Sequence, residues 1–336
     1  MRDQNAGARA AVHVGAWITE DIVRAEAKRL RERRHCFATF LRQEVRGLSP
    51  ARPAGERHAV ESDGRPAGPR QPETAPQRRT DALSQVMDQE PLSGGTIDEA
   101  EVAQFARLAG QWWNPHGPMA ALHKFNPVRI AYIRDRSAEH FGRDPTQRNG
   151  LAGLRVLDLG CGGGILCEPL TRLGATVVGA DPAPDNIAAA RQHAAHSELA
   201  IDYRSTTAEA LEQAGEWFDA VLAMEIVEHV THVGTFVEVA AALVKPGGLL
   251  FVATLNRTMK SFALAIVGAE YILGWLPRGT HQWGRFVTPN ELASAIEGSG
   301  LQIIDETGVI YNLLADRWQL STDMDVNYMV AAEKPA

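Results

Sequence analysis

The chain has 336 residues, of which 45% are hydrophobic, so it is long enough for one large or two modest domains with a sizeable core. Its formal net charge is −7, but the charge is unevenly spread. Residues 1–86 carry 16 Lys and Arg against 11 Asp and Glu, whereas residues 87–336 carry 18 against 30. The larger part is therefore acidic, which argues against broad binding of nucleic acid.

Cysteine usage and hydropathy favour a reducing compartment and no membrane span. The three cysteines, Cys36, Cys161 and Cys167, have neither the spacing of a zinc site nor that of a disulfide framework. No run of about 18 uninterrupted apolar residues occurs, so no transmembrane helix is predicted. The N-terminus lacks the apolar core of a secretory signal. We expect a cytoplasmic protein.

The first 91 residues are expected to be a disordered or weakly structured basic extension, and 92–336 the folded domain. Residues 49–91 are rich in Pro, Arg, Gly and Gln, with too few large apolar residues to offset the entropy of ordering. The extension is interpreted as a dispensable tail, or as an over-long translation start with Met87 as the true one. A mitochondrial transit peptide is the alternative, although acidic residues are unusual in such a peptide.

The folded domain is predicted to start with a helix and to continue with alternating strands and helices. Thr96 and Glu99 have the spacing of a capping box, and apolar residues follow at helical spacing as far as Trp113. Strands are predicted at 154–160, 175–181, 201–206, 218–224 and 248–255, with helices at 165–173, 184–196 and 233–244. This alternation predicts a parallel sheet with helices on both faces. A helix from Thr288 to about Ser299 and two strands, near 301–307 and 325–333, are predicted to end the chain.

The first strand of this series runs into a glycine loop, and the second strand ends in a carboxylate. Gly160 and Gly162 allow a sharp turn and close approach of the backbone to a ligand. Asp181 lies 21 residues beyond Gly160, where a carboxylate can accept both ribose hydroxyls. Asp158, beside the loop, would repel a pyrophosphate and suits a cationic ligand such as the sulfonium and ammonium of S-adenosylmethionine. A nicotinamide dinucleotide, or a tight turn without ligand, is the alternative.

These features resemble the class I S-adenosylmethionine-dependent methyltransferases. The resemblance implies a Rossmann-like sheet of seven mostly parallel strands in the order 3-2-1-4-5-7-6, with strand 7 antiparallel. It also implies that Gly160 and its neighbours hold the methionine part of the cofactor and that Asp181 holds the ribose. Met224, at the end of the fourth strand, would lie beside the cofactor, and residues 207–209 near the adenine.

Further stretches narrow the resemblance. These are LHKFNPVR at 122–129, MEIVEHV at 224–230, TLNR at 254–257, VGAEYIL at 267–273 and DVNYM at 325–329. From about residue 97 to 332 the chain is similar to the ubiquinone biosynthesis O-methyltransferases. That family methylates phenolic hydroxyls of 2-polyprenyl-6-hydroxyphenol and 3-demethylubiquinol, and its arginine matching Arg129 contacts the cofactor. The alternatives are a methyltransferase for another small phenol or a carbon acceptor, and a non-catalytic cofactor-binding subunit of a membrane biosynthetic complex.

Glu225, Glu228 and His229 follow the fourth strand, at the sheet edge where ligands of α/β proteins bind. If they form a helical turn, all three lie on one face and could hold Mg²⁺, Mn²⁺ or Zn²⁺. A phenol with a pKa of about 10 is mostly neutral at pH 7. A Lewis acid would stabilise the phenolate, while His229 could take the proton. A solvated Glu and His face is the alternative.

Residues 256–281 form an apolar insertion after the fifth strand. Arg257, Lys260 and Arg278 flank the apolar run, and Glu270 interrupts it, so it is too short and too charged to span a bilayer. This pattern is typical of a helix lying at an anionic membrane surface, where it would give access to a polyprenylated substrate. We expect peripheral association with the inner membrane, where a ubiquinone-biosynthesis complex could also bind the enzyme. A lid packed on the core is the alternative.

Overall fold

The computed structural model describes residues 95–264, 283–312 and 315–336. Apart from Gly95, these residues belong to one compact unit. The prediction for the N-terminal extension, and that for residues 265–281 of the apolar insertion, lie outside the described residues. None of the helices within these ranges is long and apolar enough to cross a membrane.

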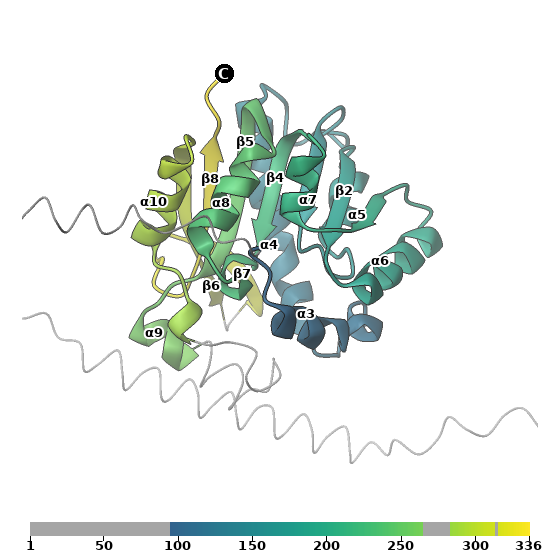
Figure 1. The fold of residues 1–336 in the computed structure, drawn as a ribbon, viewed down its shortest axis with the longest axis horizontal. Coiled ribbons are helices and arrows are strands. Elements are labelled where there is room, and N and C mark those ends of the chain that lie inside the picture. Colours follow the sequence, from purple (N-terminus) through teal and green to yellow (C-terminus); the bar gives the residue numbers. More distant parts are fainter. Residues whose placement is uncertain (1–94, 265–282, 313–314) are drawn as a thin grey trace, which may run out of the picture. The chain divides into compact units, whose positions relative to one another are not determined.

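An eight-stranded sheet in the order β3-β2-β1-β4-β5-β8-β6-β7 forms the centre of this unit (Figure 1). The strands are β1 Arg155–Leu159, β2 Thr176–Asp181, β3 Asp202–Ser205, β4 Phe218–Met224, β5 Val244–Leu255, β6 Gln302–Asn312, β7 Arg317–Ser321 and β8 Asn327–Glu333. The first five pair in parallel, and β8 is antiparallel to both β5 and β6. The predicted strand order, with its reversed last strand between the fifth and sixth, is confirmed.

The expected number of seven strands is wrong for the described residues, because β7 forms an additional antiparallel pair with β6 at the sheet edge. This strand has only five residues, and none of them is buried. A short strand at an edge does not need the alternation of apolar and polar residues that reveals a half-buried strand in a sequence. The sequence therefore carried no signal for it.

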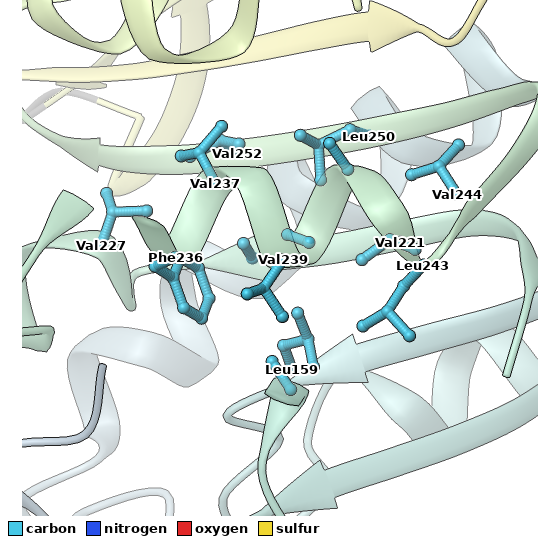
Figure 2. Close-up of a cluster of buried hydrophobic side chains, with 14 of the residues drawn as sticks. Leu159, Val221, Val227, Phe236, Val237, Val239, Leu243, Val244, Leu250 and Val252 are labelled. Carbon is cyan, nitrogen blue, oxygen red and sulfur yellow. The ribbon is translucent and has the colours of Figure 1, made fainter. Parts of the chain in front are cut away.

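Helices cover both faces of the sheet, as predicted. One face carries α4 Ala120–His140, α5 Cys167–Arg172 and α6 Pro184–His196, and the other carries α7 Ala208–Gln213, α8 Val233–Ala242 and α10 Pro289–Gly298. Figure 2 shows how Leu159, Val221 and Val252 of the strands meet Phe236 and Val239 of α8. Successive residues of a strand point to opposite faces. In the central strands nearly all successive residues are apolar and buried, so both faces of these strands are apolar. Full burial of each such side chain stabilises the fold by about 1.5–3 kcal/mol.

Ahead of α4 and the first strand, the chain forms α3 Glu99–Ala106 and the 3-10 helix η1 Ala109–Gln111. The predicted capping box of Thr96 and Glu99 is wrong, because Asp98 is the N-cap and accepts hydrogen bonds from the backbone N–H groups of Ala100 and Glu101. Thr96 instead donates its backbone N–H and its hydroxyl to Glu209 of α7, at 2.8 and 2.6 Å. A contact across the fold thus replaces the local cap.

Three further short helices complete the described residues. They are η2 Val227–His229, α9 Met259–Ser261 and η4 Trp283–Arg285. Two residues separate the helix η2 from β4, and η2 is followed by Val230. Ile97, which precedes α3, forms an isolated antiparallel bridge with Val230. Thr231 adds a hydrogen bond from its backbone N–H to the carbonyl of Thr96. Residues 96–97, at the start of the described domain, are thereby tied to the segment that follows β4.

Candidate active site

The glycine loop between β1 and α5 packs against protein side chains. Gly160 and Gly162 have φ angles of 65° and 53°, a region that side chains rarely adopt. A Cβ at Gly160 would lie 2.5 Å from Cδ1 of Ile226, and one at Gly162 would collide with the indole of Trp112. The loop therefore needs glycine to turn and to let these two side chains approach, in addition to any ligand.

Asp181 ends β2 next to this loop, as predicted, and its side chain is buried. Its carboxylate accepts hydrogen bonds from the backbone N–H groups of Gly162 and Ala183, both at 2.9 Å, and from Nδ2 of Asn186 at 3.1 Å. Burial raises the pKa of Asp181, and these three donors oppose the rise. A carboxylate oriented in this way can accept further donors from a ligand, as two ribose hydroxyls would require.

Asp158 of β1 and Arg129 of α4 are both buried and interact electrostatically. Burial raises the pKa of Asp158 to about 6, against the opposing effects of the Cys167 thiol and the Arg129 guanidinium. The thiol donates to Asp158 Oδ2 at 3.1 Å. Burial lowers the pKa of Arg129, and the charges of Glu225 and Asp158 oppose that change. The structure thus brings together three of the predicted site residues from α4, β1 and the end of β4.

Arg129 is held from within its own helix. Its Nη2 donates to Asn126 Oδ1 at 3.0 Å, and Asn126 in turn donates to the carbonyl of Ile165 at 2.6 Å. Its Nε has no hydrogen-bond partner among the described residues, although it is buried. Such an unpaired buried donor is costly unless a ligand or water completes it. The position suits an acceptor group of a bound cofactor.

Met224 and Glu225 lie where β4 ends. Met224 is buried, and Glu225 has a φ of 61°, which is uncommon for a residue other than glycine. Burial, and then the neighbouring carboxylate of Glu228, raises the pKa of Glu225. Glu228 itself is buried and accepts a hydrogen bond from the hydroxyl of Thr254 at 2.8 Å. Because the pKa values of Glu225 and Asp158 are both raised, a cationic ligand beside these two groups would favour their ionised forms.

His229 faces the N-terminal helix α3. Its Nδ1 lies 3.2 Å from Oε2 of Glu101, and its ring meets the ring of Phe105 edge-on at 5.1 Å. Burial lowers the pKa of His229, but the hydrogen bond with Glu101 and the nearby carboxylates outweigh burial, so the pKa is raised overall. Glu101 also pairs with Arg285 at 3.5 Å. His229 is therefore oriented by a residue that sequence analysis had not selected.

The helical turn that would place Glu225, Glu228 and His229 on one face does not form. The left-handed backbone of Glu225 precedes η2, so no regular turn spans the three residues. Glu228 bonds to Thr254, whereas His229 bonds to Glu101. Across the described ranges, no group of three or more His, Cys, Asp or Glu side chains could hold a metal ion. The three residues do not fit a common metal site in this arrangement. Oε1 of Glu225 and Oε1 of Glu228 are nevertheless buried without a hydrogen-bond partner in the described structure.

Sequence analysis missed Glu101, Trp112 and Asn186, which support the predicted residues from outside the motifs. Trp112 donates its Nε1–H to Asn186 Oδ1 at 2.9 Å, and Asn186 donates to Asp181. The paired tryptophans Trp112 and Trp113 were one available signal, since large aromatic side chains are highly buried on average. Near the expected adenine position, the Thr207 hydroxyl accepts a hydrogen bond from Ala210 N–H as the N-cap of α7, and Glu209 is engaged by Thr96.

The sheet order, the glycine loop and the carboxylates at its edge define a methyltransferase domain of the Rossmann-like class. A family model described as a methyltransferase domain matches residues 129–306. A ubiquinone biosynthesis O-methyltransferase from Methylobacterium nodulans is 62% identical over 243 residues, which are 72% of this chain and 98% of the relative. Proteins of the same name from Chelativorans sp. and Mesorhizobium japonicum are 61% and 60% identical, each over 71% of this chain and 95% and 96% of the relative.

The chain belongs to the family of ubiquinone biosynthesis O-methyltransferases. It is an S-adenosylmethionine-dependent O-methyltransferase. The predictions of family, fold, enzyme class and methyl donor are therefore confirmed.

Proposed function

We propose that the enzyme methylates phenolic hydroxyls of the polyprenylated intermediates 2-polyprenyl-6-hydroxyphenol and 3-demethylubiquinol. The observation that carries this proposal is the meeting of two groups at the end of β4. One is the buried set of ionisable groups formed by Asp158, Arg129 and Glu225, and the other is His229 held by Glu101. The first environment suits the cationic methyl donor, and the second suits the hydroxyl that has to lose its proton. Methyl transfer needs the two side by side. The name shared by the relatives supports the choice of acceptor.

The cofactor would be held from three elements. The carboxylate of Asp181 would accept the ribose hydroxyls, and Asp158 with Glu225 would offset the positive charge of the sulfonium and ammonium groups. Arg129 would bind an acceptor group through its unpaired Nε. Gly160, Gly162 and Met224 would shape the wall along the methionine part. These contacts mainly orient the methyl group, which lowers the entropic part of the barrier.

His229 would accept the proton of the acceptor hydroxyl. When Nδ1 carries the hydrogen and donates it to Glu101, Nε2 is left with a lone pair for the phenol proton. The phenol oxygen then forms a bond to the methyl carbon while the bond from that carbon to sulfur breaks. The bonding pair stays on sulfur, so the sulfonium becomes the neutral thioether of S-adenosylhomocysteine. Glu101 and then Glu228 would favour positive charge on His229 during this step.

A divalent cation such as Mg²⁺ or Zn²⁺ stays a prediction. Its support is limited to the two unpartnered carboxylate oxygens of Glu225 and Glu228, since His229 is engaged by Glu101. Protein prepared without metal should be compared with and without added Mg²⁺ or Zn²⁺. Methyl transfer that responds to neither cation nor to chelator would remove the cation from the proposal.

Binding to an anionic inner-membrane surface is proposed for the segment around residues 256–281. The support is that Met259, Phe262 and Trp283 are exposed by 72%, 39% and 36% on either side of residues 265–282. Liposome flotation of Met259→Glu and Trp283→Glu variants tests it, with Trp217→Glu as the matched exposed control. Equal flotation of all three variants would contradict the proposal. A partner complex of ubiquinone biosynthesis could be sought on the same membranes.

The acceptor is tested by methyl transfer to a short-chain demethylubiquinol, with a soluble catechol that lacks a prenyl tail as the comparison. We expect turnover that is faster with the prenylated acceptor. Equal turnover of the catechol would favour a methyltransferase for small phenols. Binding of S-adenosylmethionine without any turnover would favour a non-catalytic subunit.

A further inference from the structure

We infer that Trp112 and Asn186 are positioning residues for Asp181, so that the N-terminal segment of the domain sets the affinity for the ribose of the cofactor. The inference rests on the proposed role of Asp181 as the ribose-binding carboxylate. Neither residue is part of the glycine loop or of the strands that carry the predicted site. Their role follows from a chain of buried hydrogen bonds.

Each hydrogen bond in this series is donated in the same direction, from the indole toward the carboxylate. Trp112 Nε1 donates to Asn186 Oδ1 at 2.9 Å, and Asn186 Nδ2 donates to Asp181 Oδ1 at 3.1 Å. An indole N–H can only donate, so the oxygen of the Asn186 amide has to face Trp112. Its NH₂ group then has to face Asp181. The carboxylate, which only accepts, requires the same orientation, so Trp112 anchors the oxygen end of an amide whose NH₂ end meets Asp181.

Burial leaves the amide few other partners. Trp112, Asn186 and Asp181 are exposed by 7%, 1% and 6%. If the indole N–H were absent, the buried Oδ1 of Asn186 would lack this donor, and the side chain would lose the contact that holds its NH₂ group against Asp181. Displacement of the side chain toward another donor would leave Asp181 without one of its three donors. The carboxylate would then lose the orientation needed to accept two hydroxyls at once.

The indole also packs on the loop that supplies another of those donors. A Cβ on Gly162 or Gly163 would collide with Trp112, and the N–H of Gly162 donates to Asp181 at 2.9 Å. The next residue, Trp113, donates its Nε1–H to the carbonyl of Gly163 at 2.8 Å and stacks on His193 at 3.5 Å. The helix η1 packs against α6, which carries Asn186 and His193. Both tryptophans thus fix the loop, but only Trp112 acts on Asp181 through an amide.

The test measures recognition of the ribose hydroxyls separately from the rest of the cofactor. Calorimetry on the full chain compares S-adenosylhomocysteine with its analogue lacking both ribose hydroxyls. Trp112→Phe keeps an aromatic ring and removes the N–H, and Asn186→Ala removes the amide. Each variant should bind S-adenosylhomocysteine about tenfold more weakly, as for a hydrogen bond to a charged group. The affinity of each variant for the analogue should differ by less than about twofold from that of the unchanged protein. A general loosening of the loop would instead weaken the binding of both ligands.

Two controls separate this inference from the proposed function on which it rests. Asp181→Asn should abolish the preference for the hydroxyls, and Trp217→Phe, an exposed tryptophan, should leave it unchanged. The double variant Trp112→Phe/Asn186→Ala should bind no more weakly than Asn186→Ala alone, because both act through one amide. If Asp181→Asn keeps the preference, the ribose role itself is wrong. If Asp181→Asn loses it while Trp112→Phe and Asn186→Ala weaken both ligands equally, the positioning role is wrong.

Discussion

At the scale of single residues, Asp158 is subject to opposite demands from folding and from ligand binding. Its carboxyl is buried beside Arg129, and burial raises its pKa from 3.8 to about 6. The folded protein therefore holds the proton more tightly than the unfolded chain does. The stability that this provides is complete below about pH 3.8 and is lost as the pH rises through about 6.

Asp158→Asn is therefore expected to stabilise the cofactor-free protein. The shift in pKa corresponds to about 3 kcal/mol at about pH 8 and to about half of that at about pH 5. Urea unfolding at both pH values measures the gain, with Glu212→Gln on the exposed surface of α7 as the control. The same variant should bind S-adenosylmethionine more weakly, because it loses the charge opposite the sulfonium. A gain that is equal at both pH values would contradict this explanation.

Glu101 offers a prediction about catalysis. Glu101→Gln keeps the size of the side chain but lets the amide donate to His229, which favours the wrong tautomer of the imidazole. We expect kcat to fall by about 100-fold, the usual order for general-base catalysis, with little change in the Kd for S-adenosylmethionine. Glu99→Gln, on the exposed side of the same helix, is the matched control. An unchanged kcat in Glu101→Gln would show that His229 does not need this carboxylate.

At the scale of elements, the link between β1, the glycine loop and η2 can be tested through Gly160. An alanine there has to adopt a left-handed backbone and meets Cδ1 of Ile226, which precedes η2. Gly160→Ala should lower the free energy of unfolding by about 2 to 3 kcal/mol. In an Ile226→Ala background only the backbone cost, about 1 kcal/mol, should remain.

Gly234→Ala in α8 is the matched control for this prediction. Nothing lies within 4 Å of a Cβ at Gly234, so alanine should be neutral or stabilising there. Urea unfolding of the three variants and the double variant gives the comparison. The same cost for Gly160→Ala in both backgrounds would mean that the contact with Ile226 is unimportant.

At the scale of the whole molecule, the sheet and its two helical layers are expected to function without the N-terminal extension. The described contacts that support the site start at Thr96, which is tied to Glu209 and Thr231. Protein made from residues 87–336 should therefore keep the kcat and the thermal midpoint of the full chain. Methyl transfer and thermal unfolding of both forms check this. A large loss of activity in the shorter form would give the extension a role.

Local patterns in the sequence were sufficient for the central strands and for the residues of the motifs. The apolar runs at 154–160 and 218–224 predict β1 and β4 within one or two residues, because a strand buried on both faces leaves a continuous apolar signal. The helix α4 was not predicted, since Pro127 lies inside it and its buried face includes polar residues such as Asn126 and Arg129. Such a helix is stabilised by contacts with its surroundings more than by its own periodicity.

The sequence by itself determined the alternation of strands and helices, the glycine loop and the pair of Asp158 and Asp181, because each depends on short stretches of the chain. The strand order and the methyl donor followed from the resemblance that these stretches carry. Only the tertiary structure decided what supports the residues of the site. Glu101 meets His229 across 128 positions, and Trp112 meets Asn186 across 74. It also placed Glu225 outside the helix η2 that carries Glu228 and His229, because the left-handed backbone at Glu225 does not continue a helix. Spacing along the chain cannot reveal such contacts, since they arise only when separate elements pack at one edge of the sheet.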